Sequence, residues 1–155
     1  MFDPDDLDPV TASYHEAGHV LMAHLLGGRV VTASIETEED DWMGHTAVEW
    51  SHADPLEHAR RSAMVALAGP IAEAHWSGSA TLLDALTSWR GDWLEVERAL
   101  AIVPADERDV TLRGWLADTR FELTNDVAWE HVCRVADMLE AHGTLDETLV
   151  EDALA

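Results

Sequence analysis

The chain has 155 residues, 47% of them hydrophobic, which predicts one folded domain with a buried core. Nine Lys and Arg against 31 Asp and Glu give a net charge of −22, which argues against nucleic acid or an anionic membrane as a partner. The single cysteine, Cys133, excludes an internal disulfide. Residues 1–6 lack the basic lead of a secretory signal, and no apolar run is long enough to cross a bilayer. We therefore expect a cytoplasmic protein without membrane insertion.

The N-terminal part of the sequence predicts a helix and then a β-hairpin. Asp8 and Pro9 are typical of a helix start and Gly27 of a helix end, so we expect a helix from about residue 9 to residue 26. Apolar and polar residues alternate over 31–36 and again over 46–50, which indicates two strands of a hairpin.

The rest of the chain predicts helices. Residues 54–57 form a capping box that opens a helix to about residue 76, and Pro70 is expected to kink or break it. Further helices are expected over 80–89, 92–103 and 106–141, the last with a break near 124–125, and residues 144–147 form a capping box for a final short helix. The predicted fold class is mainly α with a small β-hairpin or sheet (α+β).

The first predicted helix carries the most informative motif, His15-Glu16-Ala17-Gly18-His19. Residues four apart lie on the same side of a helix, so the two imidazoles can bind one zinc ion. Glu16 lies beside them, where its carboxylate can act on a water molecule bound to the metal. The alternative is a helix that carries two solvated histidines.

A catalytic zinc site needs a third protein ligand and one open position. Glu73 lies in an otherwise apolar helix, where a carboxylate is costly unless it has a partner. Asp92 opens a predicted helix, where it also fits a capping box. From the residues alone, Glu73 and Asp92 are equally good candidates for the third ligand.

Several segments resemble the peptidase domain of the FtsH-type ATP-dependent zinc metalloproteases. Residues 14–19 resemble that family's metal motif, residues 44–46 are similar to its Gly-aromatic-Thr strand, and residues 67–73 resemble its Leu-Gly-Gly-Arg-Ala-Ala-Glu helix. Residues 91–94 fall where the family has an Asp-Leu whose aspartate is a zinc ligand, and residues 136–154 resemble its closing helix. The sequence departs from the family at Pro70 and in the lead into residue 92, and it holds no ATPase module.

The resemblance implies a zincin-like metallopeptidase domain spanning 1–155, with a metal-site core over 1–104 and C-terminal helices over 105–155. It implies one Zn²⁺ per chain, bound by His15, His19 and Asp92. Glu73 then becomes a residue that orients a ligand histidine, or the alternative ligand.

The expected function is hydrolysis of peptide bonds, with Glu16 as the general base. Gly44, His45 and Thr46 are candidates for substrate binding, because an extended peptide can add to the edge of their strand. Without an ATPase module, we expect substrates that are flexible or already unfolded, or a separate partner or unfoldase that supplies them. The alternative function is a zinc-binding regulatory or partner-binding protein with little proteolytic turnover. The sequence sets neither the substrate nor the oligomeric state.

Overall fold

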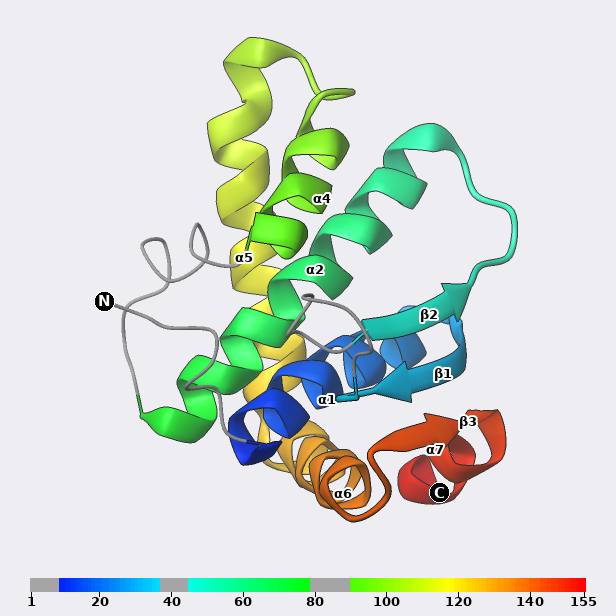
Figure 1. Ribbon diagram of the computed structural model, residues 1–155. Coiled ribbons are helices and arrows are strands. Elements are labelled where there is room, and N and C mark those ends of the chain that lie inside the picture. The colour runs from blue at the N-terminus through cyan, green and yellow to red at the C-terminus, as the bar shows by residue number, and fades with distance from the viewer. Residues whose placement is uncertain (1–8, 37–44, 79–89) are drawn as a thin grey trace.

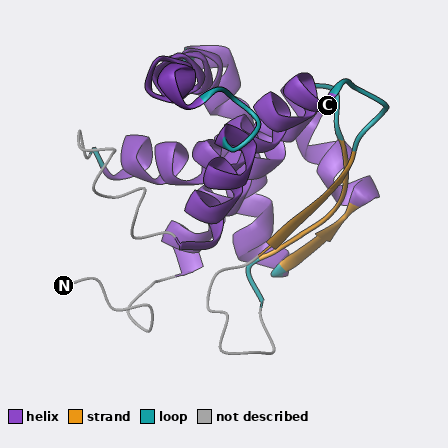
Figure 2. Cartoon of the chain, turned by 90° about the horizontal axis from the view of Figure 1, so that it is seen from above, coloured by secondary structure: helices purple, strands orange, loops and turns teal. Residues whose placement is uncertain are grey.

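The computed structural model describes residues 9–36, 45–78 and 90–155. Within these ranges the fold is mainly helical, with a small antiparallel sheet on one side of the helices (Figures 1 and 2). The elements are α1 (Pro9–Leu25), β1 (Arg29–Ser34), β2 (His45–Glu49), α2 (Pro55–Ser77), α4 (Arg90–Leu100), η2 (Ala105–Glu107), α5 (Arg108–Thr124), α6 (Asp126–His142), β3 (Thr144–Asp146) and α7 (Glu147–Leu154). The predicted α+β class, the first helix and the hairpin are confirmed.

Helices α1 and α2 form the centre of the molecule and approach each other closely. Gly18 makes this approach possible, because a Cβ atom at that position would lie 2.7 Å from the Cβ atom of Ala72. Ala68 and Ala72 contribute equally small side chains from α2, and both are fully buried. The close packing holds the middle of α1 against α2, and the motif residues of α1 lie in that stretch.

The sheet has the strand order β2-β1-β3, with both pairs antiparallel. Val30 pairs with Val48 across the hairpin, and Ala33 pairs with Leu145 of the third strand. The sequence did not predict β3, which has only three residues. Thr144 and Asp146 are exposed while Leu145 is fully buried, so the strand anchors the C-terminal segment to the sheet.

The C-terminal helices share one hydrophobic core with the N-terminal part of the chain. Leu123 of α5 and Leu139 of α6 are fully buried in the same cluster as Leu21 of α1 and Leu67 of α2. The break predicted near 124–125 is confirmed: α5 ends at Thr124, and Asn125 caps α6 by accepting a hydrogen bond of 3.0 Å from the backbone N–H of Ala128.

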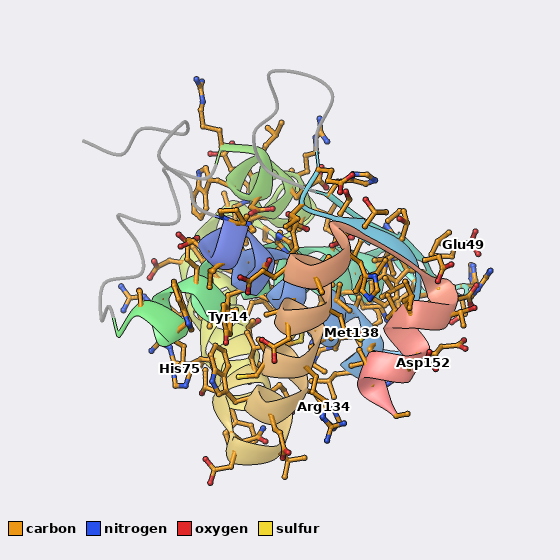
Figure 3. All side chains as sticks on the ribbon, turned by 60° about the horizontal axis from the view of Figure 1, so that its bottom comes forward. Tyr14, Glu49, His75, Arg134, Met138 and Asp152 are labelled. Atoms are coloured by element: carbon orange, nitrogen blue, oxygen red, sulfur yellow. The ribbon has the colours of Figure 1, made fainter. Side chains whose placement is uncertain are left out.

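An aromatic cluster joins α6 to α1 and α2. The ring of Tyr14 stacks on Trp76 with a centroid distance of 4.9 Å and on Trp129 with a distance of 5.9 Å. His75 contacts Trp129 edge-on at 4.4 Å. Figure 3 labels Tyr14 and His75, which both contact Trp129 of α6. This cluster lies directly beside the histidine motif, since Tyr14 precedes His15.

The break expected at Pro70 and the position expected for the cap of the last helix are both wrong. Helix α2 runs through Pro70 without a break, because the surrounding turns from Ala63 to Ala74 are almost completely buried and their packing outweighs the lost hydrogen bond. The cap of the last helix is Asp146, whose Oδ1 accepts from the N–H of Leu149 at 2.9 Å, whereas the sequence placed it at Thr144. The helix expected over 80–89 lies outside the described residues. None of the described helices has the length and apolar character of a membrane span.

Candidate metal centre

The two motif histidines and the glutamate between them are buried in the middle of α1. The exposed fractions are 2% for His15, 2% for Glu16 and 7% for His19. The structure therefore does not agree with the alternative of two solvated histidines. Buried polar groups of this kind are costly unless each finds a partner, so their contacts define the site.

His15 lies between two carboxylates. Its Nδ1 atom is 3.2 Å from Oε2 of Glu73 on α2, and its Nε2 atom is 2.8 Å from Oδ2 of Asp92 on α4. Both carboxylate groups are mostly shielded from solvent, with exposed fractions of 17% for Glu73 and 18% for Asp92. The two candidates for the third ligand thus both reach His15, but at opposite sides of its ring.

Each ring nitrogen of His19 also lies next to an oxygen atom, and one of these oxygens belongs to the backbone. Its Nδ1 atom donates to the carbonyl oxygen of Val65 at 2.6 Å, and its Nε2 atom lies 3.3 Å from Oδ1 of Asp92. The carboxylate of Asp92 therefore bridges the Nε2 atoms of His15 and His19, while Glu73 lies on the other side of the His15 ring, against its Nδ1 atom. This geometry favours Asp92 as the third ligand and Glu73 as the group that orients the His15 ring.

The charges of the site depend strongly on one another. Burial acts to lower the pKa of His15, but hydrogen bonds with Asp92 and Glu73 outweigh it and raise the pKa to about 10. For His19, burial likewise acts to lower the pKa, and the attraction of Asp92 raises it overall. Burial acts to raise the pKa of Asp92, but the nearby His19 and the hydrogen bond from His15 hold it well below its usual range. The shared Asp92 carboxylate therefore raises the pKa of both imidazoles, and they in turn lower the pKa of Asp92.

The donor set fits a zinc ion. Two donor atoms that each lie about 2.0–2.1 Å from a tetrahedral zinc are about 3.3 Å apart. Oδ2 of Asp92 is 2.8 Å from Nε2 of His15, and Oδ1 of Asp92 is 3.3 Å from Nε2 of His19. The two imidazole rings are arranged edge-on, with 4.8 Å between their centroids. Each Nδ1 atom has an acceptor, which leaves both Nε2 atoms for the metal, as in most protein zinc sites.

Gly69 of α2 leaves the space that this donor set needs. A Cβ atom at position 69 would lie 2.5 Å from Nε2 of His19 and 2.7 Å from Nε2 of His15. Val65, Gly69 and Glu73 are spaced four residues apart and therefore lie on the same face of α2. This face lies against the two imidazoles at each of the three positions. The sequence reasoning missed Val65 and Gly69. The four-residue spacing and a glycine inside a predicted helix were the available signals.

Glu16 is connected to the sheet rather than to Asp92. Its Oε2 atom accepts a hydrogen bond of 2.8 Å from Oγ1 of Thr46 on β2. One ligand atom from each of His15, Glu16 and His19 falls within a cluster no more than 4.8 Å across, so the carboxylate lies beside the candidate metal position. Thr46 was expected to bind substrate, and it contacts Glu16, the candidate general base, directly. His45 is exposed at the start of β2, and Gly44 lies outside the described residues.

Comparison with known proteins adds no identification. No protein-family model matches the chain, and no curated protein matches it. The resemblance to the FtsH-type peptidases stays a prediction from the sequence.

Proposed function

We propose that this protein is a zinc-dependent metallopeptidase that hydrolyses peptide bonds in flexible or unfolded polypeptides. The observation that carries the proposal is the convergence of both Nε2 atoms, from His15 and His19, on the Asp92 carboxylate, while both Nδ1 atoms are held by oxygen acceptors. The resemblance of residues 14–19 to the metal motif of FtsH-type peptidases supports the same conclusion.

His15, His19 and Asp92 would hold the zinc ion. Two imidazoles and one carboxylate are a ligand set of catalytic zinc sites, which keep one position open. When bound there, zinc supplies a Lewis acid that activates water and polarises a peptide carbonyl. Glu73 and the Val65 carbonyl fix the two rings, so that the Nε2 lone pairs point toward the same place.

Glu16 is the proposed general base. It takes a proton from the attacking water as the water oxygen bonds to the carbonyl carbon, and it delivers that proton to the amide nitrogen as the C–N bond breaks. Thr46 donates to one carboxylate oxygen of Glu16 and so fixes the orientation of the group. A purely structural zinc site has no need of such a base, and the presence of Glu16 therefore favours an enzyme.

Strand β2 is the proposed place for the substrate backbone. Within the described residues β2 pairs only with β1, and Thr46 places this strand beside Glu16. An extended peptide can add to such an edge through backbone hydrogen bonds. This mode of binding requires an unfolded or flexible chain, which agrees with the substrate class proposed.

The test combines metal analysis with cleavage of an unstructured peptide library. We expect one zinc ion per chain and hydrolysis by the native protein. Glu16→Gln is expected to keep the zinc and to lose at least about a hundredfold in rate, the usual contribution of a general base. Equal rates for the two proteins would reject the mechanism. Bound zinc without cleavage by the native chain would instead support the regulatory zinc-binding protein that the sequence left as the alternative.

A further inference from the structure

A groove of about 670 Å³ lies away from the candidate metal centre, between the start of α2 and the segment that joins α4 to α5. Figure 1 shows the start of α2, the end of α4 and the start of α5 in the upper part of the molecule. Glu57 of the groove and Gly69 of the metal centre are both on α2, and the offset of twelve positions between them corresponds to about 18 Å at 1.5 Å per residue. The groove is therefore separate from the proposed catalytic chemistry.

The groove gathers large apolar side chains that are exposed to solvent. Leu56 is 57% exposed, Ile102 is 49% exposed and Val110 is 73% exposed, and all three line it. They come from α2, from the turn that follows α4 and from α5, so the fold brings together three separate segments of the chain. Exposed apolar side chains that gather in a concave surface are typical of a protein-binding site.

The rim of the groove is acidic. Its charged residues are four carboxylates, from Asp54, Glu57, Asp106 and Glu107, and one guanidinium, from Arg60. Arg60 is already paired, because its Nη1 atom donates to Glu57 at 3.2 Å. Across residues 9–36, 45–78 and 90–155, no ion pair engages Asp106 or Glu107. Glu57 is paired with both Arg60 and Arg61, whereas Asp106 and Glu107 keep the rim net negative around the apolar side chains.

We propose that this groove docks a basic polypeptide segment of another protein, with a large apolar side chain on the groove floor and Lys or Arg residues against the acidic rim. Charge complementarity selects this occupant. A second copy of the chain is disfavoured, because each copy carries a net charge of −22 and would bring like charge to the rim. The groove would hold this segment of the partner protein independently of the metal centre.

The test measures binding of a short fluorescent peptide in which Lys residues flank two Leu residues one helical turn apart. Glu16→Gln serves as the parent protein, so that the probe stays intact whether or not the native chain is a peptidase. We expect saturable binding that weakens at high salt. A Glu-for-Lys peptide and a Ser-for-Leu peptide are both expected to bind at least about tenfold more weakly.

Matched variants locate the binding. Ile102→Ser with Val110→Ser is expected to weaken binding about tenfold, whereas Phe121→Ser with Val127→Ser, at side chains exposed by 75% and 70% outside the groove, is expected to leave it unchanged. Asp106→Asn with Glu107→Gln is expected to weaken binding and reduce its salt dependence, and Asp118→Asn with Glu122→Gln, on exposed parts of α5, is the charge control.

Three results would overturn the proposal. They are absence of binding to the parent protein, equal losses in the groove variants and their controls, and a native dimer that Ile102→Ser with Val110→Ser converts to a monomer. The last result would assign the groove to a second copy of the chain. Each outcome is independent of whether the protein proves to be a peptidase.

Discussion

At the scale of single residues, the centre is defined by what its imidazole nitrogens face. Each of the four ring nitrogens of His15 and His19 lies next to an oxygen atom of Glu73, Asp92 or Val65. To donate to all of these oxygens, both rings must be cationic, and two buried cations side by side repel each other. A metal ion replaces the protons on the Nε2 atoms and leaves the Nδ1 hydrogen bonds in place.

The two carboxylates should therefore differ in their effect on metal binding. We expect Asp92→Ala to lose zinc, because it removes the group that faces both Nε2 atoms. Glu73→Ala is expected to retain zinc with an affinity about 10–100-fold lower, the usual effect of losing a group that orients a ligand histidine. Zinc titration with a competing chelator measures both. Glu95→Ala, which removes an exposed partner of Arg98 on α4, is the control. If Glu73→Ala loses zinc and Asp92→Ala retains it, the third ligand is Glu73 and not Asp92.

Gly69→Ala tests the space beside the imidazoles. The added methyl group would lie 2.5 Å from Nε2 of His19, so we expect loss of zinc although alanine is the better helix former. Gly114→Ala on α5 is the matched control, because a Cβ atom there meets nothing within 4 Å. It should keep zinc and gain up to about 1 kcal/mol in stability. An unchanged zinc affinity in Gly69→Ala would show that the ion does not bind between these rings.

The sequence predicted part of the centre and not the rest, for physical reasons. His15, Glu16 and His19 lie on one helix, so their spacing alone brings them together. The choice between Asp92 and Glu73 depends on how α2 and α4 pack, which helical periodicity does not determine. The contribution of Val65 comes from its backbone carbonyl and is independent of side-chain identity. Gly69 acts by having no side chain, which a motif search does not register.

At the scale of elements, three helices meet at Tyr14. This residue of α1 contacts Trp76 of α2 and Trp129 of α6, and Figure 3 shows it against α6. Desolvation and the neighbouring Cys133 raise the pKa of Tyr14 to about 12. The cluster therefore joins α6 to the two helices that carry most of the candidate centre.

The chain has a single tyrosine, so its ionisation can be followed directly by ultraviolet absorbance. We expect a midpoint near pH 12 in the folded protein, compared with about 10 in the unfolded chain. Because the folded state keeps the phenol protonated, this contribution to stability is fully present below pH 10 and is lost as the pH rises through 12. Cys133→Ala should shift the midpoint part of the way toward 10. A midpoint near 10 in the native fold would contradict the desolvation of the Tyr14 side chain.

The differences between predicted and observed elements have tertiary causes. Strand β3 has three residues and is held by its pairing with β1, so its own sequence carries too short a pattern to detect. Pro70 is tolerated because the packing of α2 against α1 outweighs local propensity. The boundaries of α1 and the start of α2 agree well with the sequence, because local caps and turns determine them.

At the scale of the whole molecule, one core supports a buried polar centre and leaves the acidic groove open on another side. The described residues before and after position 104 contribute to the same hydrophobic cluster, so the centre is stabilised by both parts of the chain. The composition gives the net charge of −22, but it does not place that charge around an apolar groove. Only the fold brings Leu56, Ile102 and Val110 together within an acidic rim.

The most direct test of the central claim is a crystal structure of the zinc-loaded protein with anomalous scattering recorded on both sides of the zinc edge. We expect one zinc peak per chain, within bonding distance of Nε2 of His15, Nε2 of His19 and the Asp92 carboxylate, with Glu73 still on Nδ1 of His15. A peak elsewhere, or zinc bound by Glu73 with Asp92 turned away, would contradict it.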